Sequence, residues 1–452
     1  MNRITRVSAF LAVLAFSAPA LSFAQTIVID GGTVHTMAGA PFVGRVVIAN
    51  GVITAVGADA VVPPDAKRID ATGLHVYPGI CDAMSTLGLI EVDAVSATND
   101  QAEMGMYNPH LEAATAIHPS SEVIPVTRAN GVTHALVAPR AGRDGIIAGQ
   151  VALVNLDGWT VEEMAINPSV AVVINWPSIV TRRFDSTTFS FKDTPYNDAK
   201  EEAEKKQNEL REWVEAARHY KQAKGSEGSR AGADQKLAAL SECFEGKKAV
   251  IIQAEAKRDI EAAIAFADEY GFRMILAGGG EAWKLKDILA KKNIPVILAR
   301  TQSLPREEDD PYHQPYSNPG LLRAAGVRIA FASGAGGGGG GGSGAHSSRT
   351  IPYEAAMATG FGLSEDEAMR AITISPAEIF GVSDRLGSLE AGKIANVIVT
   401  DGSPLQITSN VRHLIVAGRE VSGENKHQSL YEKYRSRPHP NAGQPSAVGA
   451  RR

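Results

Sequence analysis

Residues 76–88 are Val76-Tyr77-Pro78-Gly79-Ile80-Cys81-Asp82-Ala83-Met84-Ser85-Thr86-Leu87-Gly88. The order of residue types predicts a short strand, a turn at Pro78-Gly79, a second strand and a loop. The second strand is almost wholly apolar up to Met84, which is typical of a strand buried on both faces. Cys81 lies inside it, so we expect a buried free thiol there.

Downstream of this strand, apolar strand-like runs alternate with helical spacing. The helical segments are 258–270 and 285–291. Strands that alternate with helices favour parallel strands joined by crossover helices. The number of units predicts an α/β fold, a (β/α)8 TIM barrel. The predicted strands are residues 132–138, 170–174, 249–254, 273–278, 294–298 and 327–332.

Both ends of the chain are rich in β-type sequence. Residues 45–57 predict a hairpin with Asn50-Gly51 as its two-residue loop, and residues 386–402 and 411–419 repeat the β pattern near the other end. We therefore expect one small β domain made from both termini. The predicted division is a composite β-sandwich from residues 25–74 plus 387–422, a barrel from 75–386 and a polar tail from 423–452.

The N-terminal residues 1–24 have the features of a secretory signal peptide. Arg3 and Arg6 precede an apolar stretch, and Ser22-Phe23-Ala24 provides small residues before a cut after Ala24. A membrane anchor is the alternative, but the apolar stretch is short and Pro19 interrupts it. The sequence thus predicts a periplasmic or secreted protein with no membrane attachment after cleavage.

The composition is that of a globular protein: 44% of the 452 residues are hydrophobic and 21% are charged. The formal net charge of −5 argues against a nucleic-acid partner, because there is no basic excess to neutralise phosphates. The seven glycines from Gly336 to Gly342 lack the Lys-Ser/Thr ending of a phosphate-binding loop. We interpret them as a mobile loop, with a lid and nucleotide binding as the alternatives.

Several motifs in this order resemble the amidohydrolase superfamily, in its imidazolonepropionase-like and prolidase-like branch. Its opening strand has the pattern Pro-Gly-x-x-Asp-x-His-x-His, of which Pro78, Gly79 and Asp82 are present. The resemblance implies a TIM barrel with a composite β-sandwich, and descent from enzymes that hydrolyse C–N bonds in cyclic or linear amides. The other matching segments are 27–34, 51–57, 70–73, 371–377 and 386–393.

The resemblance also locates the family's metal ligands, and here the sequence departs from the pattern. Met84 and Thr86 replace the two histidines of the first strand, and Gln253 replaces that of the fifth. Gly334 replaces the aspartate after the eighth strand, and the sixth-strand segment 276–280 has no histidine. We therefore predict a degenerate metal site with no metal ligand and no cofactor, unless other residues have rebuilt a site for zinc or another divalent metal.

Two functions follow from this. The first is an exported barrel with reduced or lost hydrolysis, which binds a small-molecule or peptide ligand. It would form a homo-oligomer, or a hetero-oligomer with an active paralogue. The second is an active hydrolase with a rebuilt or metal-independent site. Its candidate catalytic residues are Glu255, Glu281 and His346, and its candidate substrate-binding residues are Arg140 and Gln150.

Overall fold

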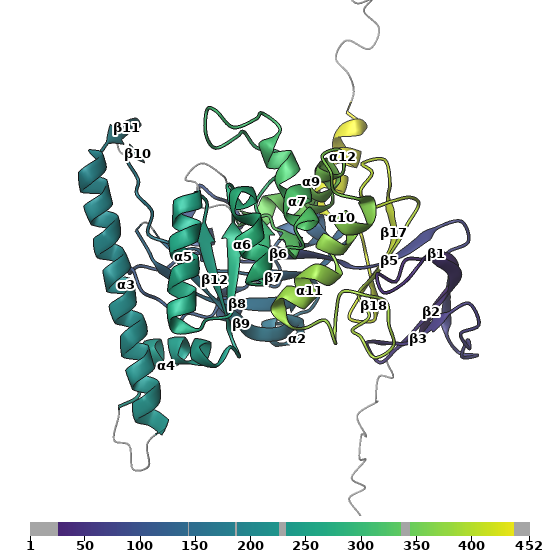
Figure 1. The fold of residues 1–452 in the computed structure, drawn as a ribbon. Coiled ribbons are helices and arrows are strands. Elements are labelled where there is room, and N and C mark those ends of the chain that lie inside the picture. Colours follow the sequence, from purple (N-terminus) through teal and green to yellow (C-terminus); the bar gives the residue numbers. More distant parts are fainter. Residues whose placement is uncertain (1–25, 143, 186–187, 226–231, 336–343, 438–452) are drawn as a thin grey trace, which may run out of the picture.

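The computed structural model describes residues 26–142, 144–185, 188–225, 232–335 and 344–437. The predicted signal peptide, the glycine run 336–342 and the end of the polar tail lie outside the described residues. Figure 1 shows a central barrel, a separate sheet on one side of it and the long helix α3 on the opposite side.

The barrel is an eight-stranded sheet with the strand order β15-β14-β13-β12-β9-β8-β7-β6. Its interior is filled by side chains that include Leu136, Val173, Ile251 and Ile297. Nearly every strand residue is buried, as expected for strands with side chains on both faces and helices outside. The strands are β6 (Ile80–Ser85), β7 (Val132–Val137), β8 (Ile147–Asn155), β9 (Ala165–Asn175), β12 (Ala249–Ala254), β13 (Met274–Gly278), β14 (Val296–Leu298) and β15 (Ile329–Phe331).

This α/β barrel confirms the predicted fold class, with one departure in its first half. β8 runs antiparallel to both of its neighbours, whereas the other neighbouring pairs in the barrel are parallel. The loop after β7 ends at Ile146, so Gln150, a candidate substrate-binding residue, lies within β8 and not in that loop. The connection of residues 138–146 is too short for a crossover helix, so the chain can only turn back on itself.

Helices cover the outside of the barrel. The crossover helix α5 (Lys257–Tyr270) packs Phe266 and Ala263 against the outer face of the strands. The others that follow the barrel strands are α1 (Val123–Arg128), α2 (Val161–Met164), α4 (Gln235–Ser241), α6 (Lys286–Lys291), α7 (Gln314–Ala324), α8 (Gly344–Ser347), α9 (Ile351–Thr359), α10 (Glu365–Ala371) and α11 (Ile374–Phe380). Short 3-10 turns are η1 (Ser96–Thr98), η2 (Ala113–Ala116), η3 (Glu242–Glu245), η4 (Ala282–Leu285) and η5 (Ser348–Thr350).

The second sheet is built from both ends of the chain, as the sequence predicts. β5 lies between β1 and β16, so an early strand and a late strand pair directly. The predicted hairpin forms, with Asn50 and Gly51 both at positive φ in its loop. The strands are β1 (Ile27–Val34), β2 (Phe42–Ala49), β3 (Val52–Gly57), β4 (Lys67–Asp70), β5 (His75–Pro78), β16 (Val397–Thr400), β17 (Val411–Val416) and β18 (Arg419–Val421).

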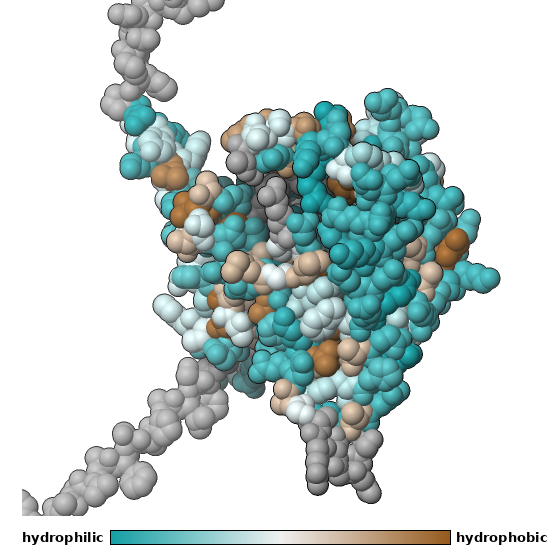
Figure 2. Space-filling view, turned by 90° about the vertical axis from the view of Figure 1, so that its left-hand side faces the viewer, coloured by the Kyte–Doolittle hydropathy of each residue, from teal (hydrophilic) through white to brown (hydrophobic). Residues whose placement is uncertain are grey.

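The opposite flank carries α3 (Tyr196–Gly225) and the small hairpin β10 (Arg182–Asp185) and β11 (Ser190–Asp193). Leu210, Val214 and other residues of one α3 face are buried, and the remaining face is charged. The surface on this side is largely hydrophilic (Figure 2). The last described helix is α12 (Lys426–Arg435). Within the described residues, no helix has both the length and the apolar character needed to cross a membrane.

Candidate functional site

The four positions that the resemblance assigns to metal ligands lie together at the C-terminal end of the barrel. The Gln253 Nε2 of β12 donates to the Met84 Sδ of β6 at 3.9 Å. The Gly334 N–H, just after β15, donates to the Met84 carbonyl oxygen at 2.8 Å. The Thr86 hydroxyl accepts the Ala345 N–H at 3.2 Å. The functional groups at this point are therefore a thioether, an amide, a hydroxyl and the backbone of a glycine.

Another polar side chain, not singled out from the sequence, joins them. Asn175 ends β9 and pairs in register with Gln253. Its Oδ1 is buried and has no hydrogen-bond partner among the described residues. The alternation of side chains along β9 could have identified it, because Ala171 and Val173 face the barrel interior and Asn175 continues that face. The centre of the barrel mouth is thus lined by neutral side chains.

Glu255 follows β12 directly, and its carboxylate lies over the end of β13. Its Oε2 accepts the Gly280 N–H at 2.8 Å. A Cβ atom on Gly278 would stand 2.3 Å from Glu255 Oε1, so only glycine leaves room for this side chain. Gly278 and Gly279 also have positive φ values of 89° and 66°. The glycines of segment 276–280 therefore make space for Glu255 at the position where the family has a histidine.

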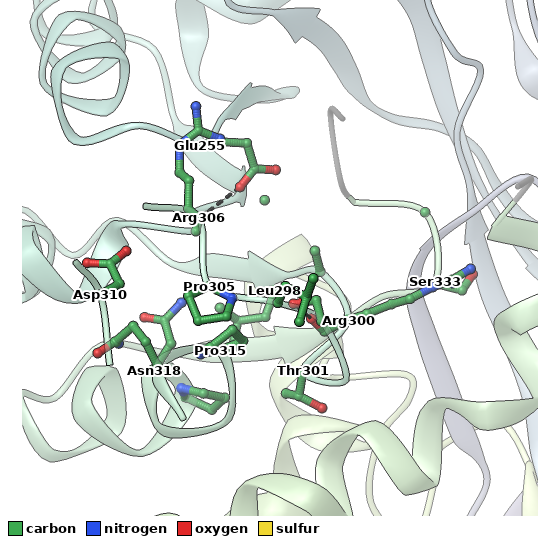
Figure 3. Close-up of a pocket in the computed structure, with 18 of the residues that line it drawn as sticks. Glu255, Leu298, Arg300, Thr301, Pro305, Arg306, Asp310, Pro315, Asn318 and Ser333 are labelled. Carbon is green, nitrogen blue, oxygen red and sulfur yellow. Dashed lines mark hydrogen bonds between the residues drawn. The ribbon is translucent and has the colours of Figure 1, made fainter. Parts of the chain in front are cut away.

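A cavity of about 380 Å³ opens beside Glu255, between the ends of the later strands and α7. Figure 3 shows Glu255 and Arg306 at one end of it, and Arg300 and Ser333 toward the other. Arg140, from the loop after β7, also lines it. The remaining lining residues include Leu298, Thr301, Leu304, Pro305, Asp310, Gln314, Pro315, Asn318 and Gly334.

The cavity brings together two of the five residues proposed from the sequence, Glu255 and Arg140. Gln150 is elsewhere: its amide donates to the Pro109 carbonyl and accepts from Ser169 and from Lys248 at 2.8 Å. Val151 and Leu153 belong to the barrel interior, so alternation along the strand points Gln150 to the outer face. It serves there as a hydrogen-bonding centre of the barrel wall.

Glu281 and His346 are not among the described residues that line the cavity. Glu281 is buried, and its carboxylate accepts the Lys257 N–H at the start of α5 and pairs with Lys284. Burial acts to raise the pKa of Glu281, but these two partners outweigh it and hold the pKa below its ordinary value. His346 is exposed on α8. The geometry therefore places Glu255 best among the three candidate acids and bases.

A buried carboxylate closes the barrel where β6 and β15 meet. Asp82 is fully buried, and its Oδ2 accepts the hydroxyls of Ser333 at 2.6 Å and Ser348 at 2.7 Å. Its Oδ1 accepts the backbone N–H groups of Ser333 and Met84. Burial, the largest influence, raises the pKa of Asp82 to about 6, although these hydrogen bonds lower it. Asp82 is recognisable in the motif, but its serine partners are distant in the sequence.

Glu354 on α9 holds the loop that forms one wall of the cavity. Its buried carboxylate accepts the Thr301 N–H and hydroxyl, both at 2.8 Å, and the Gln302 N–H at 3.2 Å. Next to this anchor, Arg300 Nη2 donates to the Ser347 hydroxyl at 2.5 Å. The sequence reasoning missed this wall, and the strand at 294–298 was the only sign that residues 299–301 would reach the mouth.

Comparison with known proteins agrees with this architecture. A model described as "Amidohydrolase family" matches residues 184–421. Amidohydrolase tasK of Hapsidospora irregularis is 23% identical over 398 residues, which make up 81% of this chain and 38% of that protein. The aligned region thus spans well under half the length of that curated relative.

Two solved structures are similar over most of the chain. An amidohydrolase from Thermotoga maritima MSB8 superposes with a TM-score of 0.73 at 25% identity, covering 88% of this chain and 99% of that one. A prolidase complexed with N-methylphosphonate-L-proline has a TM-score of 0.52 at 17% identity, covering 88% and 100%, and shows the shared fold alone. Because the family model matches more than half of the sequence, the chain belongs to the amidohydrolase family.

Proposed function

We propose that this protein is an exported member of the family. It descends from hydrolases of non-peptide C–N bonds, and its own metal site is degenerate. Its barrel would bind a small molecule and would hydrolyse it slowly or not at all. The observation that carries this proposal is the set of functional groups at the barrel mouth. Met84, Thr86, Gln253 and Gly334 lie around one point but supply neither an imidazole nor a carboxylate.

The chemistry of divalent metals explains why these groups matter. Zinc sites in hydrolases use histidine nitrogen, carboxylate oxygen or thiolate, and the metal then activates its bound water. A thioether and neutral oxygens are weak ligands for zinc. Within the described residues, no group of three or more His, Cys, Asp and Glu side chains could hold a metal ion. The side chains that are present do not fit the metal that the family implies.

The alternative is a hydrolase that works without the family metal, and one observation favours it. The Glu255 carboxylate stands in the wall of the cavity. It could take a proton from water as the water oxygen adds to an amide carbonyl carbon. The C–N bond would then break as the leaving nitrogen took up that proton. Arg140 and Arg300 could stabilise the negative charge that forms on the carbonyl oxygen.

Metal content decides between a degenerate and a rebuilt metal site. The mature chain, residues 25–452, would be incubated with zinc, manganese or iron, freed of excess metal and analysed by elemental mass spectrometry. We expect no stoichiometric metal. About one or two tightly held ions per chain would overturn the proposal.

A rebuilt variant provides the positive control. Met84→His, Thr86→His, Gln253→His and Gly334→Asp together restore four of the family's donors, and this variant should retain metal after the same treatment. A Cβ at residue 334 would lie 3.0 Å from the Met84 carbonyl oxygen, so that backbone must shift by a few tenths of an ångström. If wild type lacks metal yet hydrolyses N-acyl amino acids, and Glu255→Gln abolishes this, the metal-independent alternative holds.

The proposed location and partners follow from the sequence. We propose cleavage after Ala24 and residence in the periplasm or outside the cell, which mass spectrometry of the native N-terminus would test. A native chain that begins before residue 25 would contradict it. We further propose self-association or association with an active paralogue, for which the test is the native mass of the exported protein.

A further inference from the structure

Some of the charged groups around the cavity have charged partners within the protein, and others do not. Three guanidinium groups line it, from Arg140, Arg300 and Arg306, together with the carboxylates of Glu255 and Asp310. A cavity with low-dielectric walls focuses the field of such charges on whatever enters it. The chemistry of the ligand therefore depends on which of these charges already have partners in the protein.

Both carboxylates are used within the protein. Glu255 Oε2 accepts the Gly280 N–H at 2.8 Å. Asp310 lies 3.4 Å from the Lys284 ammonium and accepts the Glu307 N–H at 3.3 Å. Arg306, beside Glu255 in Figure 3, has the Glu307 carboxylate 3.6 Å from its Nε. The charged groups at this end of the cavity thus already have partners within the protein.

The other two guanidinium groups differ. Arg300 has the neutral hydroxyl of Ser347 as its hydrogen-bond partner. Arg140 is partly buried, and burial lowers its pKa while the charge of Asp93 acts in the opposite direction. Within the described part of the chain, neither has a carboxylate at ion-pair distance. Arg140 is partly buried and Arg300 is exposed, and a cation that no carboxylate holds at ion-pair distance attracts an anionic ligand.

We propose that the cavity binds a small organic anion, with Arg140 and Arg300 as the residues that hold its carboxylate. This inference rests on the proposed function, because it assumes that the barrel is a ligand-binding site. Arginine suits the task, since its planar fork donates two parallel hydrogen bonds to a carboxylate. A carboxylate placed there would replace the missing counter-charge.

The rest of the wall limits the body of this anion. Leu298, Leu304, Pro305 and Pro315 give the cavity an apolar side, and its volume of about 380 Å³ is at the small end for ligand pockets. Gln314 and Asn318, buried side chains on α7, add amide groups to the same wall. A carboxylate with a short apolar side chain and one amide group, as in an N-acylated amino acid, matches these features.

The test is calorimetric titration of the mature chain with two probes that differ only in charge. N-acetyl-L-leucine carries the carboxylate, and N-acetyl-L-leucinamide replaces it with a neutral amide. We expect the acid to bind about tenfold or more tightly than the amide. A chelator in all samples separates this result from the metal question. The proposed function can then fail on metal content while the anion site stands, and the reverse.

Variants assign the effect to the two arginines. Arg140→Met and Arg300→Met should each weaken the acid about tenfold or more and leave the amide unchanged. Arg300→Lys should recover only part of the affinity, because an ammonium lacks the planar fork. Arg349→Met is the matched control, since Arg349 is exposed on η5 outside the cavity. Circular dichroism would confirm that each variant is folded.

Three outcomes would overturn the inference. The first is equal binding of acid and amide by wild type, and the second is a loss in Arg349→Met as large as in Arg300→Met. The third is that titration with the acid releases no heat of binding at ligand concentrations up to about 10 mM, where even weak binding would be detected. Inorganic phosphate serves as a further probe. If phosphate binds more tightly than the acid, the site selects phosphate and the carboxylate assignment is wrong.

Discussion

Gly278 and Gly326 have almost the same backbone φ, 89° and 88°, but different surroundings. A Cβ on Gly326 meets nothing within 4 Å, whereas one on Gly278 would meet the Glu255 carboxylate at 2.3 Å. We expect Gly326→Ala to lose about 1–2 kcal/mol of unfolding free energy from backbone strain alone. Gly278→Ala should lose more, because it also displaces Glu255.

Urea denaturation measures both losses, and a double variant isolates the contact. In a Glu255→Ala background, Gly278→Ala should cost no more than Gly326→Ala, because the carboxylate is gone. Equal losses for the two glycines in the wild-type background would show that Glu255 does not lie over β13.

Asp82 gives a prediction about pH. Its pKa of about 6 exceeds that of an unfolded aspartate, about 3.9. Between these values the folded protein binds a proton that the unfolded chain has lost, so this group's contribution to stability falls as pH rises from 4 to 6. The loss is about 3 kcal/mol for a shift of this size.

Asp82→Asn removes this titration. The unfolding free energy of wild type minus that of the variant should therefore decrease by up to about 3 kcal/mol between pH 4 and 7. Denaturation at a series of pH values checks this, and the difference cancels the other titrating groups, including His134, whose pKa burial lowers to about 4. A difference that stays constant or grows with pH would contradict a buried, proton-binding Asp82.

At the scale of single residues, the sequence predicts which residues belong to the site better than it predicts their hydrogen-bond partners. Pro78, Gly79 and Asp82 mark the first barrel strand, and Gln253 and Gly334 each contact Met84 at the barrel mouth. The hydrogen bonds of Asp82 to Ser333 and Ser348 could not be predicted. They depend on how the last strand closes against the first, and no local pattern encodes that closure.

Among the elements, α9 and the wall of residues 299–313 form a coupled pair. Glu354 is the link, since one carboxylate oxygen accepts three hydrogen bonds from Thr301 and Gln302. Removing a charged acceptor leaves buried donors unsatisfied. We expect Glu354→Ala to lose about 1–3 kcal/mol of unfolding free energy and to speed amide hydrogen exchange around residues 299–302.

The wall also carries Arg300, so Glu354→Ala should weaken binding of the acid probe. Glu308→Ala is the control, because Glu308 is an exposed carboxylate in the same wall. If both variants leave exchange at 299–302 unchanged, the wall is held by other contacts and Glu354 has no positioning role.

The elements also show where sequence patterns mislead. The run from Ile147 to Asn155 is apolar enough to be a strand, but Gly149-Gln150 lies close to the Pro139-Arg140 loop, which favours a loop prediction for these two residues. The connection of residues 138–146 was the better guide. A connection that short excludes a crossover helix and requires an antiparallel neighbour.

On the scale of the whole molecule, Asn396 joins the terminal sheet to the barrel. Its Nδ2 donates to Asn155 Oδ1 of β8 at 2.8 Å, and its Oδ1 accepts the Ala417 N–H at 2.8 Å. The Gly79 N–H donates to the Asn396 carbonyl at 2.8 Å. We expect Asn396→Ala to lose about 2–4 kcal/mol, because it leaves buried groups of both parts without partners.

The same variant tests whether the two parts unfold together. Tryptophan fluorescence reports the barrel, where Trp176 lies, and circular dichroism reports the whole chain. We expect the two transitions to coincide in wild type and to shift together in Asn396→Ala. Asn410→Ala, an exposed asparagine hydrogen-bonded to Asp401, should shift neither. Separate transitions would mean that the terminal sheet is an independent unit.

The overall architecture could be predicted because it rests on repeated patterns along the chain. Alternating strands and helices indicate the barrel, and β-rich ends indicate a shared second unit. The cavity could not be predicted, since Arg140, Glu255, Arg300 and Asn318 come from four separate connections or helices. Their convergence follows from the barrel's curvature and from glycines that admit one side chain over a neighbouring strand.

The pairing of β5 with β16 has a consequence for synthesis. Ribosomes make residues 75–78 long before residues 397–400, so one edge of β5 remains open until almost the whole chain exists. An open strand edge is a template for pairing with other chains. Copies truncated before residue 397 should therefore aggregate instead of accumulating as soluble barrels. Only chains that include the late strands can cover the open edge of β5 and accumulate as soluble protein.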